Sequence, residues 1–366
     1  MRTQPLLLER PAQSRRIAVI APSLDILGGQ GVQAAALMAA LQNDGFSVSF
    51  LPVNPRFPRA LRWLRAVPYL RTVFNQILYH WQLRKIKDVD IVHLFSASYW
   101  SFLLSQAPAI EAAKRHGKPL ILNYHSGEAE DHLRHWGARV HPWLRKVQKI
   151  VVPSLYLQDV FARHGYDAQI IPNMISLSQF RYRARSPLQP KLLSVRNLEP
   201  IYRIENTLAA FPLIRAILPQ ATLTIAGYGS LESTLRKQVS EHGLLGVTFV
   251  GRVEPENIAA LYDQSDIFIN SSVVDNQPVS ILEAFAAGLP VVSTPTGDIA
   301  FMIREKQTGL LVPPDRPDAL ADAVLWLLAH QAEAVEIAGA ARQEVEKYTW
   351  GNVRADWRQL FSGEPS

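Results

Sequence analysis

The chain has 366 residues, enough for two domains of ordinary size, and its 48% hydrophobic and 19% charged residues are typical of a globular protein. It contains no Cys, which excludes structural disulfides, thiolate metal sites and a Cys nucleophile. The net charge of +6 is the sum of two unlike halves: residues 1–190 carry 24 basic and 11 acidic side chains, whereas residues 191–366 carry 14 and 21. We therefore expect a basic half that faces a partner and a second half with a different task.

The sequence contains no run of the roughly 20 apolar residues that a membrane-spanning helix requires. Residues 1–16 include only three consecutive Leu and no small-residue cleavage site, so they do not resemble a signal peptide. We expect a cytoplasmic protein that can attach peripherally to the inner face of the plasma membrane.

The first half alternates short apolar strands with helical segments. Strand Arg16–Ala21 leads through the glycine-rich residues 28–31 into a helix over Val32–Leu41, the usual opening of a doubly wound α/β domain. The strands expected after it are Ser47–Val53, Asp90–Phe95, Pro119–Tyr124, Lys149–Pro153 and Gln169–Pro172. This alternation predicts a parallel sheet with helices on both faces.

Residues 179–190 (QFRYRARSPLQP) interrupt the alternation and are interpreted as a linker between domains. A second series follows, with strands expected at Leu192–Val195, Ala221–Ala226, Val247–Val250, Asp266–Asn270, Pro290–Ser293 and Gly309–Val312. The helices expected among them are Ile204–Ile217, Leu231–His242, Ile258–Asp263, Ser280–Ala287 and Ala319–Leu328.

The pattern predicts two Rossmann-like domains, residues 1–186 and 187–349, which face each other across a cleft. Residues 350–366 are expected to form a helix that packs back toward the first domain, because Trp350, Trp357, Leu360 and Phe361 recur at helical spacing. Ligands of open parallel sheets bind at the carboxyl ends of the strands, so both domains would present loops to that cleft.

Three features of the first half are candidates for binding. The glycines at 28–31 allow close approach of an anionic ligand to the backbone, although a simple packing turn is the alternative. His93 and His125 each end an apolar run, where an imidazole can donate to substrate hydroxyls or phosphates, although a structural His is the alternative. We assign His93, and Glu128 further along the chain, to the acceptor. His132 and His135 have a helical spacing, but without a further ligand they are interpreted as a solvated helix face rather than a metal site.

Residues 275–292 carry the strongest chemical signal of the sequence. The loop DNQPVS precedes a helix whose first N–H groups suit a diphosphate. Glu283 lies one turn into this helix, where a carboxylate can bind a pair of vicinal hydroxyls, and Asp275 lies on the incoming loop. Two carboxylates beside a phosphate-binding loop suit a sugar nucleotide; the alternative is a capping Asp and a solvated Glu.

The chain resembles the retaining glycosyltransferases of family 4, which have the GT-B fold. The resemblance covers nearly the whole length and rests on the order and spacing of motifs: the glycine turn at 28–31, YHSGE at 124–128, VVPS at 151–154, IPN at 171–173, IAGYG at 225–229, FVGRV at 249–253, D-x7-E at 275–283, EAFAAGLPVV at 283–292 and TGLLVPP at 308–314.

The resemblance implies a role for each matching residue. Gly29 and Gly31 would contact the donor phosphates or the acceptor, and His125 would hydrogen-bond the transferred sugar with support from Glu128. Val253 would line the base pocket, and Glu283 would bind the ribose. The residues that would hold the sugar and the diphosphate are Asp275, Asn276, Pro278, Val279 and Ser280.

The chain departs from the family at the phosphate-binding cations. Asn197 stands where the family has Arg, and Tyr202 stands where it has Lys, while Arg196 and Arg203 lie one position away from each. Arg is long and binds phosphate through a fork of donors, so either could reach the diphosphate. In addition, Asp275 stands where the family usually has Glu.

Together these features predict sugar transfer, with retention of configuration, from a nucleotide diphosphate sugar to a glycan or lipid-linked acceptor in cell-surface polysaccharide synthesis. No metal and no cofactor are expected. The alternatives are a catalytically silent GT-B protein that binds nucleotide sugar or glycan, and a nucleotide-sugar epimerase.

Residues 56–87 contain eight basic and no acidic side chains. The aromatic residues interleaved with them are Phe57, Trp63, Tyr69, Phe74, Tyr79 and Trp81. This mixture suits an anionic membrane surface. The alternatives are core aromatics beneath a solvated basic face, and a nucleic-acid site, for which there is no other sign.

Overall fold

The computed structural model describes residues 15–25 and 28–362, and the chain divides into two compact units. The first unit comprises Met1–Pro172 with Val353–Ser366, and the second comprises Asn173–Asn352. Residues 1–14, which hold most of the segment compared above with a signal peptide, lie outside the described residues. None of the helices in the described ranges is both long enough and apolar enough to cross a membrane.

Parallel strands form one six-stranded sheet in the described part of the first unit, in the order β2-β1-β3-β4-β5-β6. The central strands are buried over nearly their whole length, as expected where helices cover both faces. The strands are β1 (Arg16–Ala21), β2 (Ser47–Pro52), β3 (Ile91–Ser96), β4 (Leu120–Tyr124), β5 (Lys149–Val152) and β6 (Ala168–Ile170).

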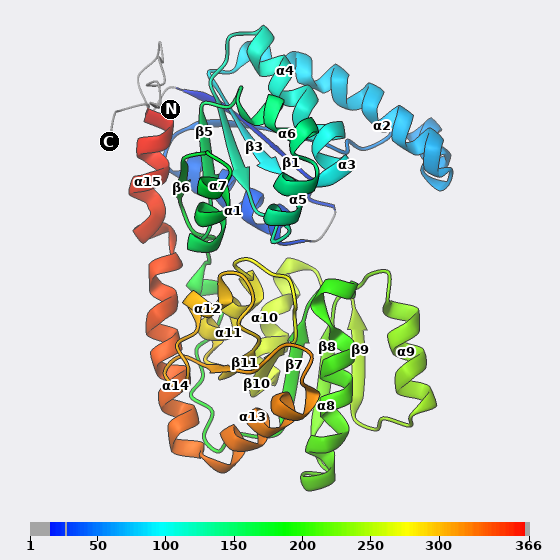
Figure 1. The fold of residues 1–366 in the computed structure, drawn as a ribbon, viewed down its shortest axis with the longest axis vertical. Helices are drawn as coiled ribbons and strands as arrows, with labels where there is room; N and C mark the ends of the chain where they lie inside the picture. Colours follow the sequence, from blue (N-terminus) through cyan, green and yellow to red (C-terminus); the bar gives the residue numbers. More distant parts are fainter. Residues whose placement is uncertain (1–14, 26–27, 363–366) are drawn as a thin grey trace. The chain divides into compact units, whose positions relative to one another are not determined.

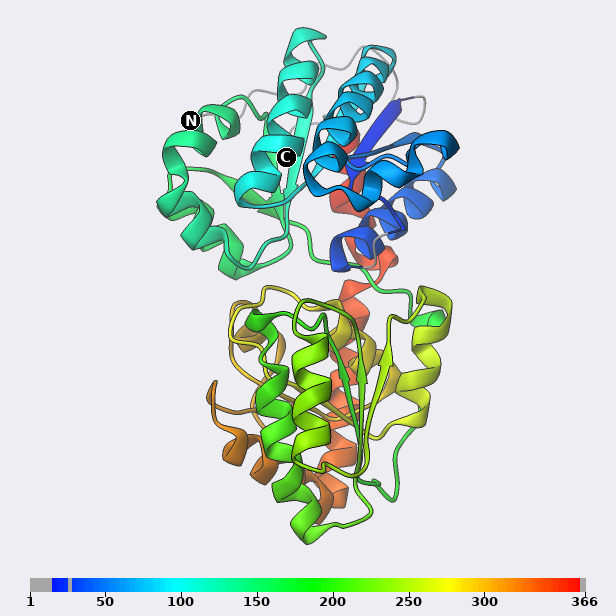
Figure 2. The ribbon, with the colours of Figure 1, turned by 90° about the vertical axis from the view of Figure 1, so that its right-hand side faces the viewer.

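Helices lie on both faces of this sheet (Figure 1 and Figure 2). They are α1 (Gly29–Asn43), α2 (Pro68–Leu83), α3 (Tyr99–Ser101), α4 (Ala107–Arg115), α5 (Ala129–His135), α6 (Gly137–Leu144) and α7 (Leu155–Arg163). Short 3-10 helices, Arg59–Ala66 and Arg84–Asp88, flank α2, which extends beyond the edge of the unit (Figure 1). A π-helical turn, Phe102–Gln106, separates α3 from α4.

Helix α1 begins earlier than the sequence predicts. Gly29 and Gly31 lie in its first turn, and the N–H group of Val32 already donates to the Gly28 carbonyl over 3.1 Å. The prediction began the helix at the first apolar residue of the periodic pattern. Glycine has a low helix propensity, so the glycines before that residue were not assigned to the helix.

A second parallel sheet has the order β12-β11-β10-β7-β8-β9 in the described residues of the second unit. Its strands are β7 (Lys191–Val195), β8 (Thr222–Ala226), β9 (Val247–Gly251), β10 (Ile267–Asn270), β11 (Val291–Ser293) and β12 (Leu310–Leu311). Its helices are α8 (Ile204–Ile217), α9 (Glu232–Glu241), α10 (Pro255–Gln264), α11 (Val279–Ala287), α12 (Ile299–Met302), α13 (Pro317–Ala329) and α14 (Gln331–Glu344).

Successive side chains of these strands enter two separate cores. Leu192 and Ile267 belong to one apolar cluster, whereas their neighbours Leu193 and Phe268 belong to the other. Side chains alternate between the two faces of a strand, so the two clusters lie on opposite faces of the sheet. The two doubly wound α/β domains predicted from the sequence are therefore present.

The segment interpreted as a linker is an integral part of the second unit, so the interpretation was wrong. Arg185 is 2% exposed, and its guanidinium donates to the carbonyls of Ser265, Ala287 and Tyr262 over 2.6–2.7 Å. It also pairs with Asp266. The many Pro and Arg residues suggested a solvated linker. Instead, the Arg185 guanidinium donates hydrogen bonds to buried carbonyls, which would cost free energy if they had no donor.

The last helix, α15 (Trp350–Ser362), is assigned to the first unit from Val353 onward. Trp357 and Phe361 are buried, and the Trp357 ring lies 5.4 Å from the ring of His93. An ion pair between Arg354 and Asp44, at 2.7 Å, fixes the exposed side of the helix. The 3.6-residue spacing of its apolar side chains thus gives the helix one buried face.

Candidate active site

Polar loops gather at the carboxyl edge of the second sheet. They follow its strands at residues 196–203, 227–231, 252–254, 271–278 and 294–298. Because the strands are parallel, these loops leave the same edge, where an open α/β sheet binds its ligands.

Arg196 follows β7 and joins its own loop to the end of β10 and to the loop that follows β10. Its Nε donates to Asn270 Oδ1 over 2.9 Å, and its Nη2 forms an ion pair with Asp275. The Arg196 and Asp275 side chains are only 10% and 11% exposed. The third nitrogen, Nη1, has no hydrogen-bond partner in the described part of the chain, so the guanidinium is held in place with a donor left for a ligand.

Tyr202, which replaces the family's Lys, packs against this guanidinium. The Arg196 carbon Cζ lies 5.0 Å from the centre of the Tyr202 ring, the arrangement of a cation–π contact. Asn197, which replaces the family's Arg, is exposed. Arg196, one position before Asn197, therefore lies in this cluster of loops, and Tyr202 helps to fix its position.

Arg203 has a different environment from Arg196. It adopts a left-handed backbone conformation, with φ at 48°, and caps the start of α8. Its guanidinium pairs with Glu205 and Asp315, each at 3.3 Å. Two carboxylates already neutralise Arg203, so the structure supplies Arg196 as the better candidate for a phosphate.

Two glycines let the loops approach each other closely. A Cβ at Gly227 would lie 1.8 Å from the Arg196 carbonyl oxygen, and one at Gly297 would lie 2.0 Å from that of Asp275. Both also have positive φ, at 145° and 55°. No other residue fits either position without moving the loop that carries the ion pair.

The loop before α11 is anchored through Gln277. Its side-chain oxygen accepts from the Asn173 N–H at 2.6 Å, and its carbonyl accepts from the Asn173 side chain at 2.7 Å. The N–H of Asp298 donates to the carbonyl of Asn276 over 3.2 Å. Asn276 and Pro278 are buried, so this loop is held rigid before any ligand binds.

Helix α11 begins at Val279, directly after this loop. Val279 is half-buried, and Ser280 is 7% exposed. The Ser280 hydroxyl is buried and has no hydrogen-bond partner among the described residues. A buried hydroxyl at the positive end of a helix is suited to an anionic ligand.

Glu283 is half-buried on α11 and accepts a hydrogen bond from the Tyr262 hydroxyl at 2.7 Å. Burial raises the pKa of Glu283 to about 7, although the Tyr262 bond and the charge of Arg196 act in the opposite direction. Glu283 is thus neither a solvated Glu nor permanently charged at neutral pH. Asp275 is ion-paired rather than a helix cap.

Val253 lies on the loop after β9 and is half-buried. It therefore lies at the same edge of the second sheet as Arg196, although β8 separates its strand from β7.

The sequence analysis missed Asn270, Tyr262 and Asn173. Asn270 is the last residue of the apolar strand β10, so the rule that selected His125 could have found it. Tyr262 lies in α10 and Asn173 in an irregular segment. Their partners are 21 and 104 residues away in sequence, and no local pattern indicates them.

The glycines at the start of α1 lie at the carboxyl end of β1 in the first unit. A Cβ built at Gly28 or Gly29 would meet no atom of the described residues within 4 Å. Gly31 is buried. Among the described residues, the open space of this turn therefore lies at Gly28 and Gly29 and not at Gly31.

His125 directly follows β4, as predicted, and is half-buried. Its ring stacks on Phe95 at 5.3 Å, and burial lowers the pKa of His125 to about 4, so the ring is neutral at physiological pH. Glu128 is half-buried at the start of α5; burial, with the charge of Asp131, raises its pKa above the usual range.

His93 was wrongly expected to end its strand. It lies inside β3, is 0% exposed, and packs against the rings of Trp357 and Phe361 from α15. Burial lowers the pKa of His93 to about 3. A side chain without exposed surface cannot contact an acceptor, so His93 is a core residue. The sequence could not reveal that the C-terminal helix covers it.

His132 and His135 do not share a solvated face. His132 is buried, and its Nδ1 lies 2.9 Å from the Tyr124 hydroxyl, whereas His135 is exposed and pairs with Asp131 at 2.8 Å. Within residues 15–25 and 28–362, no group of three or more acidic, His or Cys side chains could hold a metal ion.

Comparison with known proteins gives matches to both units. The family model described as "Glycosyltransferase Family 4" matches residues 27–179, and "Glycosyl transferases group 1" matches residues 189–330. A glycogen synthase of Mycobacterium tuberculosis is 30% identical over 288 residues, which cover 74% of this chain and 68% of that protein. A phosphatidyl-myo-inositol mannosyltransferase of Mycolicibacterium smegmatis is 25% identical over 371 residues, which cover 94% of this chain and 93% of that protein.

Solved structures are similar over almost the entire chain. Sucrose-phosphate synthase from Thermosynechococcus elongatus has a TM-score of 0.73 at 22% identity, covering 96% of this chain and 100% of that chain. HepE of Anabaena in complex with UDP-glucose has a TM-score of 0.72 at 15% identity, with the same coverage of each chain. This likeness confirms the GT-B fold expected from the sequence.

The two family models match the two doubly wound domains in turn, and the glycogen synthase relative, at 30% identity, covers 74% of the chain. The chain therefore belongs to the family 4, or group 1, glycosyltransferases.

Proposed function

We propose that this glycosyltransferase moves a sugar from a nucleotide diphosphate sugar to a hydroxyl of a glycan or lipid-linked acceptor, with retention of anomeric configuration and without a metal ion. Relatives and structural neighbours support the class of donor. One relative, 29% identical over 202 residues, is a GDP-mannose-dependent mannosyltransferase of Mycobacterium tuberculosis, and the HepE structure contains UDP-glucose.

The observation that carries the proposal is the arrangement of Arg196. The leaving group is a nucleoside diphosphate, so the main requirement is positive charge fixed in advance where negative charge develops. Arg196 offers Nη1 from a guanidinium that Asn270 and Asp275 hold in place. The N–H groups of Val279 and Ser280 lie in the first turn of α11, where helix N–H groups have no intrahelical acceptor.

The other residues have proposed roles around this charge. Glu283 would accept hydrogen bonds from both ribose hydroxyls, and Val253 would line the base pocket. Asn276 and Pro278 would shape the loop that binds the diphosphate. Asp275 would contact the transferred sugar while it keeps Arg196 in place.

In the first unit, the open space at Gly29 suits close approach of a ligand to the backbone, whereas Gly31 is buried. His125 is neutral and can donate one hydrogen bond to the transferred sugar, with Glu128 nearby in sequence. Arg203 would have at most a supporting part, because Glu205 and Asp315 already neutralise it.

In the reaction, the bond between the anomeric carbon and the diphosphate oxygen breaks, and a bond between that carbon and the acceptor oxygen forms. The acceptor proton passes to the departing diphosphate oxygen. Asp275 is ion-paired and Glu283 is hydrogen-bonded to Tyr262, so neither is free to form a covalent intermediate. We therefore propose attack and departure on the same face of the sugar, which retains the configuration.

We propose further that helix α2 and its flanking turns contact an anionic membrane. Leu70, Val73, Ile77 and Trp81 recur at helical spacing and are 49–60% exposed. Six exposed cations accompany this apolar stripe: Arg59, Arg62, Arg71, Arg84, Lys85 and Lys87. An apolar helix face bordered by cations is the pattern of a helix that lies in a lipid headgroup region.

Incubation with UDP-, GDP- and dTDP-sugars and a glycan or lipid acceptor should release nucleoside diphosphate for at least one donor, with EDTA present throughout. Proton NMR of the first product should show the anomeric configuration of the donor. An inverted product would contradict the retaining mechanism. Binding without any turnover across donors and acceptors would contradict the proposed activity.

Donor affinity should depend on the ionisation of Glu283. The ribose hydroxyls donate to the charged carboxylate, so binding favours the deprotonated form, and affinity should fall as pH decreases below the pKa of about 7. Calorimetric titration with the preferred sugar nucleotide between pH 5.5 and 8.5 measures this. Sugar nucleotides are phosphate diesters, so their own charge is constant over this range. Glu283→Gln should bind more weakly and lose the pH dependence; an unchanged profile would remove Glu283 from the ribose site.

Vesicle flotation tests the membrane contact. The protein should float with phosphatidylcholine vesicles that contain phosphatidylserine, and binding should decrease as salt screens the charges. Ile77→Ser with Trp81→Ser should reduce flotation strongly, whereas Ile217→Ser, at a 64% exposed apolar residue of the second unit, should not. Flotation that does not depend on the charge of the lipid would rule out this surface. So would an equal decrease in flotation for the Ile217→Ser control.

A further inference from the structure

The hydroxyl of Tyr262 lies between two acceptors on helix α11. It is 2.7 Å from Oε2 of Glu283 and 3.1 Å from the carbonyl oxygen of Ser280. A hydroxyl has one proton, so it can donate a full hydrogen bond to only one of these acceptors at a time. Hydrogen bonds to a charged acceptor are the shorter and stronger kind. The Tyr262 proton is therefore directed to Glu283 while that carboxylate is charged.

The ring of Tyr262 is held rigidly inside the second unit. The side chain is 0% exposed, and its ring stacks on that of Phe268 in β10, with ring centres 5.9 Å apart. The ring of Phe180 packs against it at nearly a right angle, with ring centres 5.7 Å apart. The backbone carbonyl of Tyr262 accepts from the Arg185 guanidinium over 2.7 Å. The position of the hydroxyl is thus fixed before any ligand binds.

Burial and two ionisable neighbours act on the Glu283 carboxyl. Burial raises the pKa of Glu283, whereas the hydrogen bond from Tyr262 and the charge of Arg196 lower it, and the balance lies at about 7. Burial and the charge of Glu283 in turn raise the pKa of Tyr262 well above its usual range, so its hydroxyl keeps its proton. Without that hydroxyl, Arg196 alone would oppose burial, and Glu283 would hold its proton to a higher pH.

Strand β11, helix α14 and the 3-10 turn Val345–Tyr348 also pack against α11. Strand β11 has no ionisable side chain. Tyr348 is buried in the same apolar cluster as α11, and burial, with the charges of Asp298 and Glu344, raises its pKa. The charges on this side of the helix thus act on Tyr348, and the ionisation of Glu283 depends on the two neighbours named above.

The second acceptor serves the hydroxyl when Glu283 takes up a proton. The O–H of the protonated carboxyl can donate to the Tyr262 oxygen, and the Tyr262 proton then turns to the Ser280 carbonyl by rotation about the bond between ring and oxygen. Every polar group in this set keeps a hydrogen bond in both states, so the ring does not have to move. The carboxyl group therefore stays in the same place whether or not it is charged.

We infer that Tyr262 is a positioning residue of the donor site: its hydroxyl holds the Glu283 carboxylate charged and in one orientation, with the remaining lone pairs of that carboxylate turned to the ribose hydroxyls. The inference rests on the proposed function, because that function assigns the ribose to Glu283. The control of Glu283 by Tyr262 can nevertheless be measured without any ligand.

The first measurement follows the ionisation of Glu283 in the free protein. The full-length chain is labelled with ¹³C at the Glu carboxyl carbon, and the Glu283 resonance, identified by its loss in Glu283→Gln, is followed from pH 5.5 to 9.5. In Tyr262→Phe, which removes only the hydroxyl, the midpoint should rise by at least about one pH unit, the effect of losing one hydrogen bond to a charged group.

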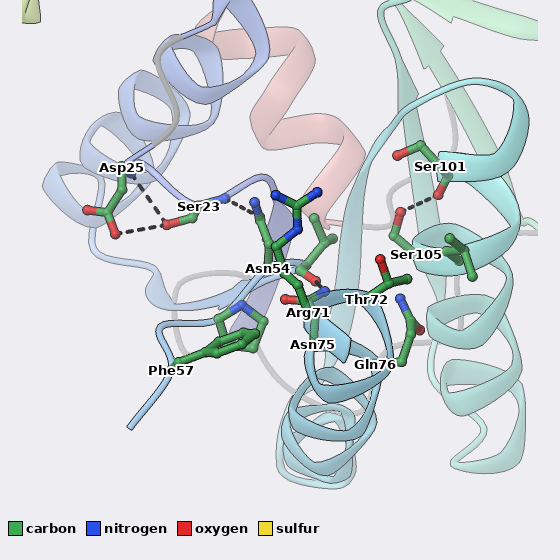
Figure 3. Close-up of a pocket in the computed structure, with 13 residues that line it drawn as sticks. Ser23, Asp25, Asn54, Phe57, Arg71, Thr72, Asn75, Gln76, Ser101 and Ser105 are labelled. Carbon is green, nitrogen blue, oxygen red and sulfur yellow. Dashed lines mark hydrogen bonds between the residues drawn. The ribbon is translucent and has the colours of Figure 1, made fainter. Parts of the chain in front are cut away.

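Tyr79→Phe is the matched control. Tyr79 is also 0% exposed, and its hydroxyl donates to a backbone carbonyl, that of Ser105, over 2.8 Å. Ser105 lines a cavity in the first unit (Figure 3), so the control removes a buried hydroxyl from the other domain. It should lower thermal stability to a similar extent and leave the Glu283 midpoint unchanged.

The second measurement is the affinity for UDP-glucose and for GDP-mannose by calorimetry. Binding favours the charged carboxylate, so a rise of one pH unit in the midpoint should weaken binding about fivefold at pH 7 and less than twofold at pH 8.5. A hydroxyl that only stabilised the fold would instead change the affinity by the same factor at both pH values.

A Glu283 midpoint that does not rise in Tyr262→Phe, or that rises equally in Tyr79→Phe, would overturn the inference. So would an equal loss of affinity at pH 7 and pH 8.5. If the midpoint rises as expected but neither sugar nucleotide binds to the unsubstituted protein, the control of Glu283 by Tyr262 stands and the proposed function is wrong.

Discussion

The buried ion pair between Arg196 and Asp275 joins the loops at the carboxyl edge of the second sheet, where we place the donor site. Both side chains are about nine-tenths buried, and the loss of one partner from such a pair costs about 3–5 kcal/mol because the other charge remains uncompensated. The pair is built from two loops that Gly227 and Gly297 allow to approach. It holds a cation in a fixed position before a diphosphate arrives, which is the condition for electrostatic catalysis.

In the proposed mechanism, Arg196 would take the part of the cations found at the usual positions of the family. Tyr202 cannot bind phosphate as Lys does, but its ring contacts Arg196. In the proposal, Arg196, the first turn of α11 and the buried Ser280 hydroxyl would bind the diphosphate together. On the first unit, α2 carries an exposed apolar stripe with exposed cations beside it, which is the surface that we propose contacts a membrane.

Much of the fold could be predicted because buried parallel strands are continuous apolar runs, as in β3, β4 and β10. The positions of Asp275 and Glu283 on a loop and a helix also followed from local spacing. Long-range contacts could not be predicted. His93 was predicted to be a ligand at a strand end, but α15 packs against it. The Arg-rich segment was predicted to be a linker, but Arg185 donates hydrogen bonds to buried carbonyls. The ion pair of Arg196 joins residues 79 positions apart, and no local pattern specifies such a contact.

The central claim, that Arg196 binds the donor diphosphate, is tested most directly by calorimetry on two matched variants. Asp275→Asn removes the internal partner, and the Arg196→Gln/Asp275→Asn double variant removes the cation as well without leaving a buried charge unpaired. Each is titrated with a nucleoside diphosphate and with the corresponding nucleoside. We predict that Asp275→Asn binds the diphosphate at least tenfold more tightly than the nucleoside, and that the double variant loses this difference. An equal preference for the diphosphate in both variants would contradict the account.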